Sequence, residues 1–323
     1  MMEDTIPQRI EENVRVRSYE VDHNFVGWRL DEYLANRIDG MSRTLAARVI
    51  KEGNATVAPR RRAKPSTRLR LDDVVTLRQE LPPEEVQDHQ VAPLFRDAHL
   101  LILDKPAGML VHETATTRLN TITHYLLRQG LPEAEPVHRI DRETSGVLVC
   151  ALTAGVVAPL RGLFAGDDPR KMYRALVLDP DHRWPPGERA TLTTPLGFDP
   201  TSRLPMRMAK GDLSATTHVQ ALRRIDHPYS PMADLRIRIE SGRQHQIRVH
   251  LFMEGTPIAG DKLYGQTDDF FTDICDHPDD QALLARLPFP RHALHAWRIE
   301  LTHPITDDRI AVEAPLPTIW GPS

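Results

Sequence analysis

The sequence predicts an α+β protein in two parts: a small α/β domain, then a larger domain around a mixed, mostly antiparallel sheet. The chain has 323 residues, enough for about two domains. A basic segment near the N-terminus gives way at residues 81–85 to the proline-containing stretch L-P-P-E-E. After residue 92, apolar strands and helices follow one another with few strict strand–helix–strand repeats, which favours an α+β arrangement over a parallel sheet.

In the first part, the residue pattern predicts two helices beside a small sheet. Apolar residues recur at helical spacing over residues 29–38, which predicts the first helix. Ser42 is a favourable N-cap for a second helix that ends at Gly53. The other expected elements are a strand at 55–57, a basic loop at 59–62 and one or two strands over 69–77.

In the second part, short apolar runs predict buried strands, and longer runs with apolar residues at helical spacing predict helices. The expected strands lie at residues 100–103, 147–152, 173–178, 216–222 and 235–240. The expected helices lie at residues 121–129, 155–164 and 244–254.

Charge is distributed unevenly, although the whole chain carries a net charge of only −4. Residues 43–78 hold ten basic and three acidic residues, so this segment carries +7 and the rest of the chain −11. Such a basic patch is typical of a module that binds a polyanion, although most charged runs are simply solvated surface. We expect contacts with RNA phosphates from six side chains of this segment: Arg43, Arg48, Lys51, Arg60, Arg61 and Arg62.

The sequence gives no sign of a membrane or secretory protein. No stretch reaches the ~18 apolar residues that a membrane-spanning helix needs, and residues 1–21 contain no apolar run that could act as a secretory signal. Cys150 and Cys275 are too few for a disulfide framework and lie in no C-x-x-C pair. We therefore expect a cytoplasmic protein, and a monomer by default.

Three short segments carry the residues best suited to chemistry. The first, residues 138–146, places Asp141 between two arginines, whose charge favours the ionised carboxylate. Considered alone, such an aspartate is more often a turn residue paired with a neighbouring arginine. The second, residues 171–176, contains Tyr173, which alone is more often a half-buried strand residue. The third, residues 240–251, predicts a tight turn followed by a helix.

Common metal and nucleotide motifs are absent from the sequence. His245 and His250 are five residues apart, which does not suit a helical zinc pair, and H-E-x-x-H does not occur. The phosphate-binding pattern G-x-x-x-x-G-K-[ST], the dinucleotide pattern G-x-G-x-x-G after a strand and the nucleophile elbow G-x-S-x-G are missing as well. We expect neither a metal nor a cofactor.

In combination, the three segments resemble the signature segments of the RluA-type RNA pseudouridine synthases. The matching motifs are H-R-I-D-R-E-T-S-G, K-x-Y-R-A-L, S-G-R-Q-H-Q-I-R-V-H, K-P-A-G-M-x-V-H and G-D-x-L-Y-G. In front of them, R-L-D-x-x-L and S-R-x-x-A-x-x-V-I-x-x-G resemble a small RNA-binding module named after a small-subunit ribosomal protein, here called the S-four-like domain. The resemblance covers about residues 14–315. It departs from the usual pattern at Ile140, where leucine is commoner, and at Gln244, where threonine or serine is commoner.

The resemblance implies that uridines within RNA are isomerised to pseudouridine by base flipping, without a cofactor. Asp141 would be the catalytic aspartate, acting as either a base or a nucleophile. Arg139 would enter the space that the flipped base vacates or guide its phosphate. Tyr173 would stack on the uracil, and Arg248 would pair with the aspartate. The other implied substrate-binding residues are His138, Arg243 and Gln246.

The implied domains are an N-terminal arm over 1–26, the S-four-like domain over 27–78, a linker over 79–91 and the catalytic domain over 92–323. An S-four-like domain is typical of family members that act on large-subunit ribosomal RNA, so this is the expected substrate, with transfer RNA second. Two other functions remain open: an RNA-binding protein without catalysis, and a carbohydrate hydrolase. The hydrolase would need a second acid, for which Glu143 and Glu240 are the candidates.

Overall fold

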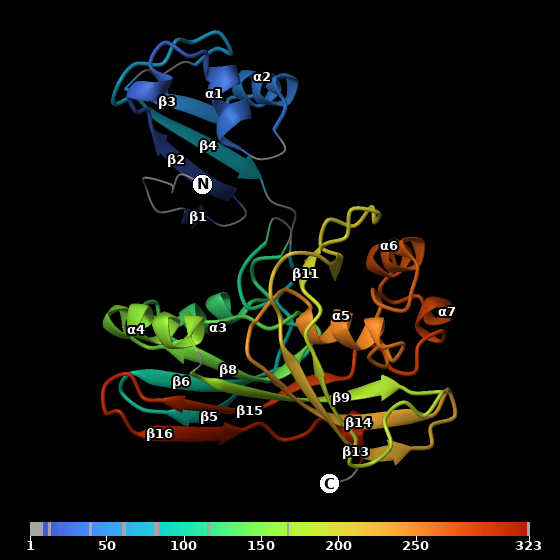
Figure 1. Ribbon diagram of the computed structural model, residues 1–323. Coiled ribbons are helices and arrows are strands. Elements are labelled where there is room, and N and C mark those ends of the chain that lie inside the picture. The colour runs from blue at the N-terminus through green and yellow to red at the C-terminus, as the bar shows by residue number, and fades with distance from the viewer. Residues whose placement is uncertain are drawn as a thin grey trace. The chain divides into compact units, whose positions relative to one another are not determined.

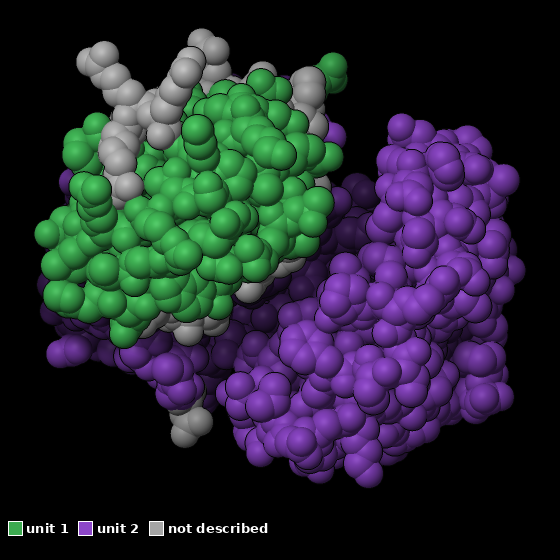
Figure 2. Space-filling view, turned by 90° about the horizontal axis from the view of Figure 1, so that it is seen from above, with its two compact units in different colours: residues 1–85 green, residues 86–323 purple. Residues whose placement is uncertain are grey.

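The structure is a computed structural model that describes residues 9–11, 14–38, 41–59, 63–80, 84–114, 117–166 and 168–321. The chain divides into two compact units, residues 1–85 and 86–323, which Figure 2 shows in different colours. Three of the expected RNA contacts, Arg60, Arg61 and Arg62, lie outside the described residues.

The first unit contains a four-stranded antiparallel sheet and two helices. Its elements in Figure 1 are β1 (Arg9–Glu11), β2 (Val14–Glu20), α1 (Leu30–Arg37), α2 (Arg43–Lys51), β3 (Ala55–Ala58) and β4 (Val74–Glu80). The strands lie in the order β1-β2-β4-β3. Both predicted helices form, and Ser42 caps α2 by accepting a hydrogen bond from the backbone N–H of Leu45 at 3.2 Å. Residues of both helices and of the sheet, among them Tyr33 and Ile50, share one hydrophobic core.

The N-terminal arm expected over residues 1–26 is wrong where β2 forms. This strand pairs with β4 along its whole length, and Tyr19 of β2 belongs to the core of the first unit. Val14 to Arg17 alternate apolar and polar residues, which favours a half-buried strand, so a local signal was present and sequence reasoning overlooked it. Pairing with a neighbouring strand, which the sequence does not display, decides the structure of this segment.

The second unit is built on a ten-stranded mixed sheet, so the predicted α+β fold class is confirmed. Its strands are β5 (Ala92–Arg96), β6 (Leu100–Lys105), β7 (Glu135–Pro136), β8 (Ser145–Ala151), β9 (Arg170–Leu178), β10 (Arg189–Leu192), β13 (Thr217–Ile225), β14 (Met232–Ile239), β15 (Leu294–Thr302) and β16 (Arg309–Glu313). They lie in the order β10-β13-β14-β9-β15-β8-β6-β5, with β7 beside β8 and β16 beside β15. Among the described strands of this sheet, only β15 and β8 pair in parallel.

Three helices lie on one face of this sheet in Figure 1: α3 (Ile122–Arg128), α4 (Ala154–Ala165) and α5 (Gln246–Met253). The unit also contains a hairpin of β11 (Leu196–Phe198) and β12 (Met208–Lys210), and the helices α6 (Asp268–Asp276) and α7 (Gln281–Leu284). The first six residues of α5 are all buried, so this helix is enclosed by the unit rather than lying on its surface. In the described parts of the chain, no helix is both long and apolar enough to cross a membrane.

The centre of the sheet determines where the loop before β8 lies. Every residue of β8 is buried, as in a central strand. Its first residues pair with β15, Ser145 opposite His295 and Gly146 opposite Ala296. Gly146 has φ +107°, and a Cβ at this position would lie 2.2 Å from the carbonyl oxygen of Ala296. A side chain at residue 146 is therefore incompatible with this close approach of the two strands.

Gly146→Ala should lower the free energy of unfolding by about 3 kcal/mol, because a methyl group adds steric overlap to a strained backbone conformation. Gly155→Ala in α4 is the matched control, since Gly155 has no positive φ and nothing lies within 4 Å of the added Cβ. Urea unfolding followed by circular dichroism measures both variants. Equal stability of the two would show that the approach of β8 to β15 does not require glycine.

Candidate active site

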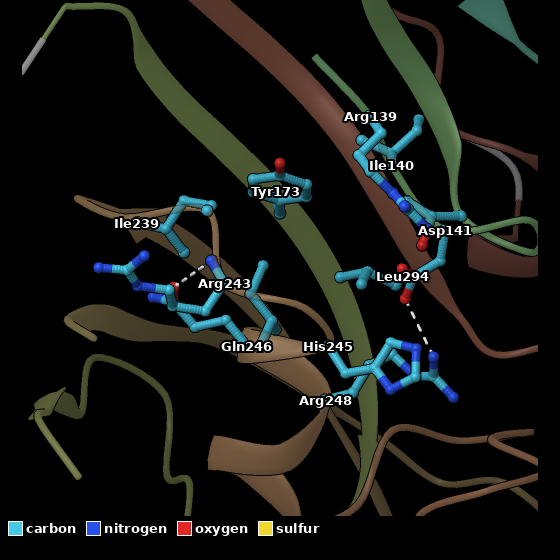
Figure 3. Close-up of a pocket in the computed structure, with 13 residues that line it drawn as sticks. Arg139, Ile140, Asp141, Tyr173, Ile239, Arg243, His245, Gln246, Arg248 and Leu294 are labelled. Atoms are coloured by element: carbon cyan, nitrogen blue, oxygen red, sulfur yellow. Dashed lines mark hydrogen bonds and ion pairs between the residues drawn. The ribbon is translucent and has the colours of Figure 1, made fainter. Parts of the chain in front are cut away.

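A pocket lies at the start of α5, beside the loop that precedes β8 (Figure 3). Side chains from that loop, from β9, from β15 and from the segment entering α5 line it. They include Asp141, Thr144, Tyr173, His245, Arg248 and Leu294. The three segments that the sequence singled out therefore converge on one place in the second unit.

Asp141 and Arg248 meet in this pocket. Nη1 of Arg248 donates to Oδ2 of Asp141 at 3.0 Å, as the dashed line in Figure 3 shows. The same guanidinium binds Asp261 with two hydrogen bonds, Nε to Oδ2 at 2.7 Å and Nη2 to Oδ1 at 2.9 Å. Arg248 thus bridges two carboxylates, and the bidentate bond to Asp261 fixes the plane of the guanidinium.

Asp261 is fully buried and anchored to the backbone. Its Oδ1 accepts hydrogen bonds from the backbone N–H groups of Leu263 at 2.8 Å and Tyr264 at 3.0 Å. The Tyr264 ring also lies against Arg248, with the guanidinium carbon 5.1 Å from the ring centroid. The orientation of Arg248 is therefore fixed by the segment that follows α5.

The electrostatics of the pocket keep Asp141 ionised. Burial alone would raise the pKa of this carboxyl group. The Arg248 cation, the hydrogen bond that it donates and the positive charges of His245 and His292 when protonated together outweigh burial, so the pKa of Asp141 lies below the ordinary value of 3.8. Burial also opposes ionisation of Asp261 and Arg248, yet their mutual attraction lowers the pKa of Asp261 and raises that of Arg248. Burial and the negative charge of Asp141 raise the pKa of the Tyr173 phenol. At neutral pH the pocket holds a carboxylate, a guanidinium and a neutral phenol.

The residues around Asp141 are held by side chains from other segments. The buried Nζ of Lys105 donates to the carbonyl oxygens of Met109 at 2.7 Å and Arg142 at 3.1 Å. The hydroxyl of Thr144 bonds Nε2 of His292 at 2.8 Å. Burial lowers the pKa of Lys105 to about 7. These bonds restrict the loop that carries the aspartate.

Three further residues of the predicted site line the same pocket. Tyr173 is buried and points into it from β9 (Figure 3). Arg139 and Arg243 are exposed and line the pocket from the loop before β8 and from the turn before α5. Nε of Arg243 donates to the carbonyl oxygen of Ser214 at 3.1 Å, which leaves its terminal nitrogens facing solvent.

Two further residues expected to contact the substrate, His138 and Gln246, form hydrogen bonds within the protein, and their contact with RNA stays a prediction. His138 does not line the pocket: its Nε2 accepts the backbone N–H of Val149 at 3.0 Å, and its ring stacks on Phe164 with centroids 4.5 Å apart. Gln246 lines the pocket, but both polar atoms of its amide are engaged, with Nε2 donating to the carbonyl oxygen of Thr216 at 2.9 Å. Both side chains bind backbone groups of the protein, which a sequence motif cannot show.

Helix α2 carries the three expected RNA contacts that the structure describes. Arg43, Arg48 and Lys51 line one groove on this helix. Arg43 lies 3.0 Å from Glu32 and Arg48 lies 3.9 Å from Glu52, so these two charges are partly neutralised. Lys51 forms no ion pair with the described residues.

Sequence reasoning missed three residues that support the site: Lys105, Asp261 and Tyr264. The first stands in K-P-A-G-M-x-V-H and the other two in G-D-x-L-Y-G, so the motifs were a signal. Their roles depend mainly on contacts with residues that are distant in the sequence, and no local pattern indicates these contacts.

The second acid that a carbohydrate hydrolase would need does not reach the pocket. Glu143 forms an ion pair with Lys262, and its other oxygen lies 3.6 Å from Nδ1 of His292. Glu240 pairs with Arg238 at 3.2 Å. Asp141 is therefore the only carboxylate among the described residues that line the pocket.

The fold and the pocket define an enzyme class, and comparison with known proteins identifies its family. The family model described as RNA pseudouridylate synthase matches residues 99–252. The Ribosomal large subunit pseudouridine synthase D of Nitrosomonas europaea is 31% identical over 322 residues, which cover 95% of this chain and 86% of that protein. The protein of the same name in Pseudomonas aeruginosa is 32% identical over 313 residues, covering 93% and 92%.

A solved structure shares the fold of the second unit. Human RNA Pseudouridylate Synthase Domain Containing 1 superposes with a TM-score of 0.53 and 22% identity, covering 73% of this chain and 86% of that one. The chain belongs to the RNA pseudouridylate synthase family. The predicted family and enzyme class are therefore confirmed, with RNA as the substrate.

Arg248→Ala should lower the free energy of unfolding at pH 7 by about 3–5 kcal/mol, because it leaves the buried Asp261 and the partly buried Asp141 without their cation. The loss should shrink as the pH falls, since protonation removes the charge of Asp141 and Asp261. Arg243→Ala is the control, because this exposed side chain should contribute no more than about 0.5 kcal/mol. Urea unfolding curves at pH 7 that coincide for the two variants would contradict the proposed arrangement of charges.

Proposed function

We propose that this protein converts uridines of large-subunit ribosomal RNA to pseudouridine, with Asp141 as the reacting group. The observation that carries the proposal is an ionised Asp141 in a pocket, paired with Arg248, which the buried Asp261 holds in place. Relatives that span nearly the whole chain bear the name of a ribosomal large subunit enzyme, which supports this RNA over transfer RNA.

The reaction moves one bond between the ribose and the uracil. The bond from C1′ to N1 breaks, the uracil leaves with the electron pair and turns over, and a new bond forms from C1′ to C5. C5 then loses its proton and N1 gains one, so no oxidant, reductant or transferred group is required. A carboxylate suits this reaction because it can attack C1′ as a nucleophile or remove a proton as a base.

Arg248 and Asp261 keep Asp141 ionised, which its role as a nucleophile and its role as a base both require. A carboxylate in a buried pocket would take up a proton if no cation lay beside it. Because the bidentate bond to Asp261 orients the guanidinium, a single N–H of Arg248 reaches Oδ2 of Asp141. No hydrogen bond from the described residues engages Oδ1 of Asp141, and this oxygen is available to the substrate.

Tyr173, Arg139 and Arg243 supply the contacts that a flipped nucleotide needs. Removing a base from its stack costs a few kcal/mol. Stacking of the uracil on the Tyr173 ring returns about 1–3 kcal/mol. The two arginines, exposed beside the pocket, contact phosphates or fill the space that the base leaves.

The first unit acts in this proposal as an S-four-like RNA-binding module that supplies affinity but no chemistry. Its helix α2 presents Arg43, Arg48 and Lys51 on one surface, where they can neutralise phosphates without reading bases. The reacting residues all belong to the second unit.

Asp141→Asn should abolish pseudouridine formation, to below roughly 0.1% of the wild-type single-turnover rate, because an amide can serve neither as nucleophile nor as base. Arg248 keeps its bidentate bond to Asp261 in this variant, so we expect folding and RNA binding close to those of the wild type. Substantial remaining turnover on a large-subunit ribosomal RNA fragment would exclude Asp141 as the reacting group.

Removal of residues 1–85 should leave the second unit folded, because the core of the first unit draws all its residues from that segment. Binding to long RNA should weaken and depend less on salt, since fewer phosphates are neutralised. Loss of about four phosphate contacts should reduce the slope of log affinity against log salt by roughly three. Equal slopes for the full chain and for residues 86–323 would show that the basic segment is ordinary solvated surface.

A further inference from the structure

His245 lines the pocket, yet none of the roles described above uses it. It lies directly before α5 with φ +53°, in the left-handed region that residues other than glycine seldom adopt. Such a conformation persists only where surrounding contacts hold it, and it is concentrated at functional sites. One contact that holds it is a hydrogen bond of 3.0 Å between Nδ1 of His245 and the hydroxyl of Tyr264.

The hydroxyl of Tyr264 determines which nitrogen of the His245 ring carries a hydrogen. The phenol oxygen accepts the backbone N–H of Met208 at 3.0 Å. Among the described residues, the only acceptor for its own hydrogen is Nδ1 of His245, so Tyr264 donates and Nδ1 accepts. Burial and the Arg248 cation lower the pKa of His245 to about 4, which leaves the ring neutral at pH 7. A neutral ring whose Nδ1 accepts carries its hydrogen on Nε2.

This hydrogen on Nε2 has no partner within the described part of the protein, although the ring stands beside Asp141 and Arg248 in the pocket (Figure 3). We propose that His245 is a further catalytic residue, whose Nε2–H donates a hydrogen bond to a carbonyl oxygen of the target uracil. Tyr264 is the positioning residue that keeps the hydrogen on Nε2.

The role of His245 rests on the proposed function and follows from where charge develops in that reaction. When the bond from C1′ to N1 breaks, the electron pair stays on the uracil, and negative charge spreads to its carbonyl oxygens. A fixed N–H donor in an enclosed pocket stabilises this charge without having to reorient. A neutral donor suits the position, because a second cation beside Arg248 would compete for Asp141.

Two substitutions distinguish a donor from a scaffold residue. His245→Asn tolerates a positive φ, and its Oδ1 can accept from Tyr264, but it is too short to supply the donor at Nε2. His245→Gln can carry an N–H group to that position. The assay is single-turnover release of tritium from C5 of uridine in a large-subunit ribosomal RNA fragment.

We expect the single-turnover rate to fall about 100-fold or more for His245→Asn and by less than about 10-fold for His245→Gln, as for removal and retention of one donor to a developing anion. RNA affinity should stay near that of the wild type in both. A rate for His245→Asn close to that of the wild type would overturn the role of His245, as would rates that simply follow the melting temperatures of the two variants. No release by the wild-type protein would instead contradict the proposed function.

The position of the hydrogen can be measured without any turnover. Long-range ¹⁵N–¹H correlation spectra of the full chain at pH 7 should show a protonated Nε2 and an unprotonated Nδ1 for His245. Tyr264→Phe, which keeps the ring beside Arg248 but removes the hydroxyl, should weaken this preference. A wild-type ring protonated on Nδ1 would overturn the proposal.

Discussion

The active site depends on one buried cation shared by two carboxylates. Arg248 binds Asp261 through two hydrogen bonds and Asp141 through one. Burying Arg248 and Asp261 completely and Asp141 in part is costly, and the arrangement is tolerated because each charge has a partner and the carboxylate of Asp261 also binds backbone N–H groups. The two carboxylates are held differently: Asp261 accepts four hydrogen bonds, whereas Asp141 accepts one side-chain hydrogen bond from the described residues, at Oδ2.

The fold brings these groups together from distant parts of the chain. Asp141 precedes the central strand β8, Arg248 lies on the enclosed helix α5, and Asp261 lies in the segment after that helix. The parallel pairing of β8 with β15, which requires Gly146, sets the start of β8 and thus the loop with the aspartate. Tyr264 then links Arg248 to the backbone of β12, so the pocket is held from several sides.

Much of this could be predicted from the sequence, for identifiable physical reasons. Helices α1 and α2 have apolar residues at helical spacing, and Ser42 also caps α2. Strand β8 is a nearly continuous apolar run. These are local features, so the sequence alone indicates the three elements. Strand β2 was overlooked although its alternating apolar and charged residues favour a strand, and only its pairing with β4 depends on tertiary structure. Within the site, the motifs indicate which residues converge. The position of the His138 side chain, in contrast, depends on its stacking on Phe164 and its hydrogen bond to β8. The link from Asp261 to Arg248 likewise depends on tertiary contacts alone.

The central claim is that Arg248 keeps a partly buried Asp141 ionised, and the pKa of that carboxyl group tests it most directly. The pKa can be measured by ¹³C NMR titration of the Asp141 side chain in the wild type and in Arg248→Met, which removes the cation but retains most of the volume. The wild-type pKa should lie below 3.8, because Arg248, together with His245 and His292 when they are protonated, outweighs burial. In Arg248→Met it should rise above the wild-type value, because the largest effect that opposes burial is then removed. A pKa that is the same in both proteins, or a wild-type value at or above 3.8, would contradict the account.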